Sequence, residues 1–321
     1  MRAWVFLAVG LIVVARSELW AQVPPGYEAA SFARIGVGAR ALSLGGAFTA
    51  VAEDITAAYW NPAGLAYLTN FQVEGMYTNW FGADIHLQYL GAGGYPPLGD
   101  SRPQLQFMNR PLVLAFNWFS SWIPNIPWSE DGTMGTFDAW SHLFIFSAAL
   151  RWDESWGIGA NIKVFHDRIL EGWSLGISWD LGILLNTHIG SNLVRVAVVT
   201  TDIGSPAIQW YGLAGGAPAY LPWLFRIGAS IRFLDEKLLL CGSLEWGVNV
   251  PGFKRAQIGA EAVVGPLALR FGWQQPLGME LATGPWCLGL GLYPFPWITL
   301  DYAFLPGRLG ETHLLALRIA I

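Results

Sequence analysis

Residues 173–183, Trp-Ser-Leu-Gly-Ile-Ser-Trp-Asp-Leu-Gly-Ile, alternate large apolar side chains with small or charged ones. Successive side chains of a β-strand point to opposite faces of a sheet, so one face of this segment is apolar and the other is small or ionised. The pattern recurs as far as the C-terminus, with few helical segments to cover the apolar faces. We therefore expect a sheet that closes into a barrel and turns its apolar face to lipid.

The composition favours a membrane protein that crosses the bilayer with strands. The chain is 53% hydrophobic and only 13% charged, whereas soluble domains carry about 25% charged residues. No mature segment contains the ~18 to 20 consecutive apolar residues of a spanning helix. Many of the 18 Trp and 10 Tyr residues fall near predicted strand ends, as in the aromatic belts of membrane barrels. A soluble β-sandwich is the alternative, but its core does not require so many aromatic rings.

The N-terminus predicts export and a division of the chain into three parts. Arg2 precedes an apolar run that ends at Ala15, and residues 19–21 supply an imperfect cleavage site, which is typical of a signal peptide. An uncleaved membrane anchor is the alternative. We predict a signal peptide at 1–21, an Ala- and Gly-rich N-terminal hatch at 22–70, and a transmembrane β-barrel at 71–321. The predicted location is the bacterial outer membrane.

The alternating segments predict an all-β fold, a transmembrane antiparallel β-barrel of about 14 strands with an N-terminal lumenal hatch. An even number of strands of about ten residues is typical of such barrels. The connections on one rim are short, whereas 121–140, 203–222 and 274–284 on the other rim are predicted as long loops. The long segment 92–110, on the short-turn rim, has no explanation in this pattern. The predicted strands are 71–80, 84–91, 111–120, 141–151, 156–167, 173–186, 193–202, 223–233, 238–248, 255–264, 266–273, 285–293, 297–304 and 312–321.

Charged residues identify the inner face of the predicted barrel. In residues 223–233, for example, Phe225 and Ile227 alternate with Arg226 and Gly228. An arginine turned toward lipid would cost about 2 to 4 kcal/mol at the bilayer midplane, so the charged face is the lumenal one. Both signs of charge are present, which predicts ion pairs across the lumen. The predicted lumen-facing charges are Lys163, Asp180, Arg195, Arg226, Arg232, Glu245, Arg255, Glu261, Arg270, Asp301 and Arg318.

The hatch carries the most distinctive sequence. Adjacent glycines at Gly45 and Gly46 permit close backbone approach or positive φ, and residues 61–64, Asn-Pro-Ala-Gly, predict a turn. Residues 38–54 and 60–65 resemble the N-terminus of the PorV/PorQ family of FadL-like outer-membrane proteins, and residues 301–313 resemble the last hairpin of that family. The resemblance implies a fourteen-stranded barrel with a hatch in its lumen. FadL-type channels have larger extracellular insertions than this chain, and Ile321 replaces the aromatic residue at which barrels often end.

Two functions follow from the resemblance. The first is an accessory or shuttle role in type IX-like protein secretion, with secreted proteins or secretion-machinery subunits as partners. The second is a FadL-like passive channel for small or hydrophobic solutes, gated by the hatch. Arg40 and Asp54 are expected to pair with lumenal charges, although they are equally suited to a purely anchoring role. The hatch and gating candidates are Arg40, Gly45, Gly46, Asp54, Asn61, Pro62 and Gly64.

The sequence lacks the motifs of several other functions. We find no phosphate-binding loop, zinc-spaced cluster or nucleophile elbow, and therefore predict no catalytic residue, metal or cofactor. A net charge of -5 offers no basic field for nucleic acid. Outer-membrane lipid is the partner that the apolar face predicts. Cys241 and Cys287 fall on one face of the predicted sheet, and the sequence leaves open whether they pair.

Overall fold

The computed structural model describes residues 29–95, 105–130, 133–212, 218–250, 254–276 and 284–321. The predicted signal peptide lies outside these ranges. The described residues contain fourteen long strands and three short ones, β3 (Gln106–Phe107), β9 (Ala207–Tyr211) and β10 (Ala219–Tyr220). The long strands are β1 (Gln72–Trp80), β2 (Ile85–Gly94), β4 (Arg110–Glu130), β5 (Thr133–Arg151), β6 (Trp156–Ile169), β7 (Gly172–Ile189), β8 (Asn192–Thr201), β11 (Leu224–Phe233), β12 (Leu238–Gly247), β13 (Lys254–Val264), β14 (Leu267–Pro276), β15 (Trp286–Phe295), β16 (Ile298–Leu305) and β17 (Thr312–Ala320).

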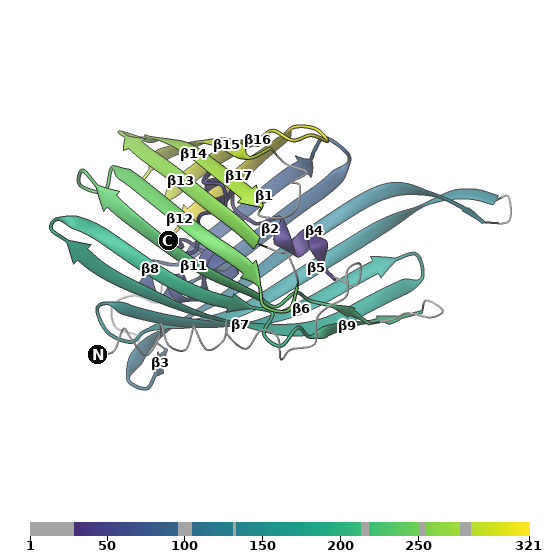
Figure 1. Ribbon diagram of the computed structural model, residues 1–321, viewed down its shortest axis with the longest axis horizontal. Coiled ribbons are helices and arrows are strands. Elements are labelled where there is room, and N and C mark those ends of the chain that lie inside the picture. Colours follow the sequence, from purple (N-terminus) through teal and green to yellow (C-terminus); the bar gives the residue numbers. More distant parts are fainter. Residues whose placement is uncertain (1–28, 96–104, 131–132, 213–217, 251–253, 277–283) are drawn as a thin grey trace.

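Each long strand pairs antiparallel with the next long strand along the chain, as the meander in Figure 1 shows. The first and last strands also pair, from Gln72 opposite Ala320 to Asn79 opposite His313. The sheet therefore closes on itself, and each long strand has a neighbour on both sides. The predicted closed antiparallel barrel of fourteen strands is confirmed.

Alternation along the strands separates the two faces of the wall as predicted. On β7, Trp179 and Leu181 are about half exposed, whereas Ser178 and Asp180 between them are buried. The outer face thus presents large apolar side chains, and the small and charged ones point inward. This arrangement suits a hydrocarbon exterior, because charged groups facing lipid would be costly.

The N-terminal segment 29–70, which we call the hatch, lies inside the barrel. It contains η2 (Ser31–Arg34), α2 (Ala39–Ser43), α3 (Ala57–Trp60) and η3 (Pro62–Tyr67). Helix α2 contacts β14 to β17, and η3 contacts β4 to β7, so the hatch reaches both sides of the lumen. None of the helices in the described ranges is long and apolar enough to span a membrane.

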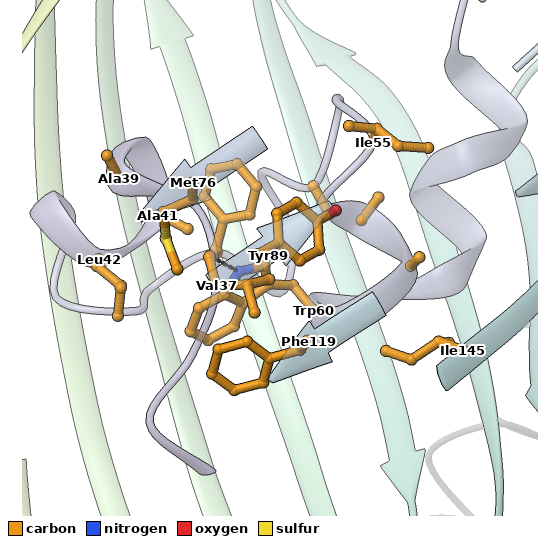
Figure 2. Close-up of a cluster of buried hydrophobic side chains, with 14 of the residues drawn as sticks. Val37, Ala39, Ala41, Leu42, Ile55, Trp60, Met76, Tyr89, Phe119 and Ile145 are labelled. Atoms are coloured by element: carbon orange, nitrogen blue, oxygen red, sulfur yellow. Dashed lines mark hydrogen bonds between the residues drawn. The ribbon is translucent and has the colours of Figure 1, made fainter. Parts of the chain in front are cut away.

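Apolar side chains of the hatch and the wall form one buried cluster, shown in Figure 2. Val37 and Trp60 of the hatch meet Met76, Tyr89 and Phe119 of the wall there. The Trp60 indole donates a hydrogen bond to the Val37 carbonyl over 2.9 Å, which satisfies the buried N–H of that ring. The hatch is therefore packed like a protein core against the inner face of β1, β2 and β4.

Strands β4 and β5 extend well beyond the barrel wall, which corrects the loop predicted at 121–140. Pairing of β2 with β4 ends at Trp122, and pairing of β6 with β5 begins at Ala139. The hairpin beyond these residues is a two-stranded ribbon that projects from the wall (Figure 1), and we call it the arm. The predicted loop at 203–222 is also partly wrong, because it contains β9 and β10. In the segment 92–110, β2 extends to Gly94 and β3 forms a short pairing with β4, while 96–104 lies outside the described residues.

A β-bulge between Ile123 and Ile126 changes which side chains of β4 face inward. On the barrel side of the bulge, even-numbered residues of β4 such as Trp122 face outward. On the arm side, the even-numbered Ile126 pairs with Phe137 of β5, whose side chain is on the inward-facing side, so Ile126 faces inward as well. The Trp128 indole covers Gly135 on that same side. The inner side of the arm is therefore apolar, and its outer side carries Asp138. This polarity is the reverse of that in the barrel wall below.

Candidate functional site: the contact between hatch and barrel

Arg40 of α2 connects the hatch to the barrel through a bidentate ion pair. Its Nε and Nη2 atoms donate to the two carboxylate oxygens of Glu261 over 2.8 and 2.7 Å. Its Nη2 also donates to Glu53 Oε1 over 2.8 Å. Burial alone would lower the pKa of Arg40, but Glu261 and Glu53 raise it well above its usual value. The guanidinium is therefore charged at any physiological pH. Its two parallel hydrogen bonds to one carboxylate make this a strong type of ion pair.

Arg270 continues this network along the inner face of the wall. It contacts Glu261 and Asp301 over 2.6 Å each, and its side chain is fully buried. Glu261 is thus shared between Arg40 of the hatch and Arg270 of the wall. Buried charges are tolerated when they are paired and hydrogen-bonded in this way.

Glu53 of the hatch meets three arginines that come from different parts of the chain. Arg195 on β8 approaches it to 2.8 Å, Arg232 on β11 makes a short contact, and Arg40 completes the group. Burial alone would raise the pKa of Glu53, but the three guanidinium groups hold it far below its usual range. Glu53 is absent from the predicted site residues, although it directly precedes Asp54 in the motif that carried the family resemblance.

Asp54 ties the hatch to the strand pair that closes the barrel. Its Oδ2 lies 2.9 Å from Nη1 of Arg318 on β17 and 3.6 Å from Nη1 of Arg40. Arg318 also lies 3.8 Å from Glu74 on β1, a buried carboxylate that the sequence analysis missed. The predicted hatch charges Arg40 and Asp54 thus belong to a single network that runs around the wall from β1 through β17 to β11 and β8.

A second set of charges lines the opposite part of the lumen. Lys163 on β6 contacts Asp180 over 2.8 Å and Asp202 over 2.6 Å. Asn161 donates both to Asp180 and to the hatch carbonyl of Ala58, over 2.9 and 2.7 Å. These contacts link the α3 region of the hatch to β6 and β7.

Arg226 and Glu245 form a third buried pair, separated by 2.7 Å. The Arg226 guanidinium lies 5.8 Å from the ring centre of Trp60 and donates to its carbonyl over 3.3 Å. Arg255 lies 3.9 Å from Glu245. All the charges predicted to face the lumen therefore lie on the inner face of the wall, and each has an ionic partner.

Inward-facing glycines let the hatch backbone lie directly on the wall. A Cβ atom on Gly272 would come within 2.1 Å of the Gly45 nitrogen, and one on Gly159 within 2.2 Å of the Pro62 carbonyl carbon. Gly182 is similarly close to the Asn61 side chain. Other wall glycines with such hatch contacts are Gly157, Gly228, Gly259 and Gly289. Glycine in a strand often marks a close backbone approach, which is its role at these positions.

The predicted hatch residues serve this docking. Gly45 and Gly46 have φ angles of 69° and 75°, which glycine adopts without strain. A Cβ on Gly64 would come within 2.0 Å of the Ala52 carbonyl oxygen. Asn61 caps η3 by accepting from the Ala63 amide over 3.1 Å, with Pro62 next to it, and donates to the Thr49 carbonyl over 3.0 Å.

A small cavity of about 40 Å³ is lined by Tyr59 and Trp60 of the hatch. Its walls combine apolar side chains such as Phe165 with the ion pairs of Lys163 and Arg226. The Tyr59 hydroxyl donates to the Ala33 carbonyl of η2 over 2.6 Å, and Ala33 also lines the cavity. Burial raises the pKa of Tyr59 to about 12 and keeps it a donor. A solute much larger than water does not fit this cavity as it stands.

The remaining histidines and cysteines of the described ranges do not form a metal site. These ranges contain no group of three or more His, Cys, Asp or Glu side chains placed to hold a metal. His86 and His142 stack on tryptophan rings along the outer face, and His166 and His313 lie against aromatic rings at tilted angles. Cys241 and Cys287 are free thiols on one row of register partners, separated by Gly259 and Gly272.

Comparisons with known proteins agree with this architecture. A model described as "Uncharacterised protein family (UPF0164)" matches residues 17–94. The fold is similar to the CymD monoaromatic hydrocarbon channel, with 15% identity, a TM-score of 0.54, and coverage of 89% of this chain and 96% of that one. It is also similar to the Pseudomonas putida toluene transporter TodX, with 13% identity, a TM-score of 0.50, and coverage of 88% and 96%. No curated protein sequence matches the chain.

These likenesses show the fold, an all-β closed antiparallel barrel of fourteen strands with a short N-terminal helical segment. Neither PorV nor PorQ is among the matching proteins named above. The finer family resemblance therefore stays a prediction.

Proposed function

We propose that this protein is an outer-membrane channel for small hydrophobic solutes and that the hatch closes its lumen. The observation that carries the proposal is the hatch itself, which fills the lumen but is held by ion pairs, hydrogen bonds and packing. All of these contacts are reversible. A plug of this kind can move aside without breaking a covalent bond, as a gate must.

The apolar inner side of the arm supports a hydrophobic solute. Ile126, Trp128 and Phe137 form an apolar strip on the side that continues the lumenal face. A solute that follows this strip reaches the mouth of the barrel and then the cavity lined by Tyr59 and Trp60. Ligand sites are mostly apolar with a few placed polar groups, and the lining of this cavity has both kinds of side chain.

The lumenal charges argue against an open pore for ions. Each of the charges named above lies against an opposite charge, so the pairs satisfy one another rather than a permeating ion. The structural likeness to channels whose names specify monoaromatic hydrocarbons and toluene points in the same direction. The secretion role predicted from the sequence has no such support and stays a prediction.

Uptake of labelled toluene by bacterial cells tests the proposal. We expect faster uptake in cells that make the wild-type protein than in cells that make an inactive control barrel of similar abundance. Deletion of residues 39–66 should accelerate uptake further, because it removes the part of the hatch that closes the lumen. Uptake equal to that of the control, together with co-purification of exported proteins that share a C-terminal domain, would favour the secretion role instead.

A further inference from the structure

The outer face of the barrel carries a groove of about 880 Å³. It crosses the strands from β14 through β17, and then β1, β2 and β4. Two neighbouring rows of outward-facing residues form its sides, and the members of each row are register partners on adjacent strands. The row nearer the arm contains Tyr302, Leu315 and Tyr77, and the other contains Leu300, Leu317 and Gly75. The volume lies within the range of about 300 to 1,000 Å³ that ligand pockets have.

Gly75 keeps this groove open at its centre. Leu317 of β17 and Leu90 of β2 are its register partners, so a large side chain at position 75 would continue a row of leucines. The φ angle of Gly75 is not positive, and the nearest atom to a Cβ placed there is 3.9 Å away. Neither the backbone nor packing within the chain requires glycine here. A glycine in a strand leaves room for a ligand to approach the backbone closely.

The two tyrosines give the groove an apolar lining despite their hydroxyl groups. The Tyr77 hydroxyl bonds His86 Nδ1 over 2.8 Å, and the Tyr302 hydroxyl bonds His313 Nδ1 over 2.7 Å. Both histidines pair with Asn79, one row nearer the arm. The hydroxyl groups are therefore satisfied outside the groove, and the rings can line it.

We propose that this groove binds an acyl chain of a membrane phospholipid. Leu315 is 65% exposed and Leu317 43%, so both face the medium around the barrel. At the depth of the apolar band that medium is hydrocarbon, and an acyl chain is the molecule at hand with the right shape and polarity. The proposal rests on the barrel's lying in a membrane and is independent of transport through the lumen.

Native mass spectrometry of the full-length protein in mild detergent tests this proposal, with dipalmitoyl phosphatidylethanolamine as the titrated probe. We expect the wild type to retain one lipid, and Gly75→Leu to reduce its occupancy at least fivefold. Gly75→Ala, a smaller change in the same open space, should cause a partial loss. Gly242→Leu is the matched control, because it adds the same side chain to the outer face of β12, away from the groove.

Three results would overturn the proposal. The first is equal lipid occupancy in the wild type, Gly75→Leu and Gly242→Leu. The second is a wild-type complex that holds free palmitate but no phospholipid, which would indicate a solute site. The third is a dimer of this chain that Gly75→Leu dissociates, which would make the groove a protein interface. Failure of toluene uptake would leave this proposal intact, so the two proposals fail separately.

Discussion

The inner side of the wall has two different chemistries, one where it meets the hatch and another where it forms the arm. Against the hatch it presents glycines such as Gly272 and charges such as Glu261, which fit a backbone and a guanidinium. On the arm, which projects from the wall, it presents Ile126, Trp128 and Phe137. Strand alternation determines which residues share a side of the sheet. The part of the molecule that packs against that side determines which residue types can stand there.

Of the variants that test this contrast, Glu53→Gln is expected to have the largest effect on how firmly the hatch is held against the wall. The substitution removes the shared counter-charge of Arg40, Arg195 and Arg232. Loss of one partner costs about 3 to 5 kcal/mol in a fully buried ion pair, and less here because the Glu53 side chain is 24% exposed. We expect about hundredfold faster amide hydrogen exchange over residues 39–66, with the β-strand amides unchanged. Glu154→Gln, at an exposed turn carboxylate, is the control. Unchanged hatch exchange would show that the arginine cluster does not hold the hatch.

A smaller effect is expected from Gly272→Ala, which tests the backbone contact rather than the charges. The added methyl group would come within 2.1 Å of the Gly45 nitrogen, and overpacking of this kind costs about 1 to 3 kcal/mol. Exchange over residues 39–66 should rise about tenfold or more. Gly242→Ala, whose Cβ would meet its nearest neighbour at 3.5 Å, should leave exchange at the wild-type rate. Equal rates in the two variants would contradict the docking role of the wall glycines.

The smallest effect is expected from Ile126→Ser, which makes the inner side of the arm more polar and changes the arm alone. Ile126 pairs with Phe137 on that side, so a hydroxyl group there interrupts the apolar strip. Toluene uptake at low concentration should fall about threefold while hatch exchange stays constant. Thr136→Ser, on the outer side of the arm opposite Pro127, is the control. If Ile126→Ser and Thr136→Ser take up toluene equally fast, the inner strip of the arm has no part in uptake.

Alternation was sufficient to predict the barrel and which charges face inward, because the two-residue repeat of apolar and polar side chains can be read from the sequence of each strand by itself. Arg270 and Asp301, for example, could be assigned to the lumen without knowing that they pair with each other. The arm escaped prediction because Pro124 and Pro127 read as loop residues. Proline is tolerated in β4 at a bulge and beyond the end of its pairing with β2, where no ladder hydrogen bond is lost on that side.

The partners within the hatch could not be predicted in the same way. The hatch has no strand period, so nothing in its sequence indicates which side chain meets which strand. Glu53 illustrates this, since its partners Arg195 and Arg232 lie more than a hundred residues away in the chain. The motif selected the correct region, and only the folded barrel brought the acid and the arginines together.

A disulfide that locks the hatch tests most directly whether its movement opens the lumen. Leu44 Cβ and Cys241 Sγ lie 2.9 and 3.0 Å from the same Cβ position on Gly259, so Leu44→Cys places a second thiol near Cys241. In a Cys287→Ser background, oxidation should reduce toluene uptake to that of cells without the channel, and reductant should restore it. The same protein with Cys241→Ser should respond to neither reagent. Full uptake with the disulfide completely formed would contradict the claim that the hatch closes this channel.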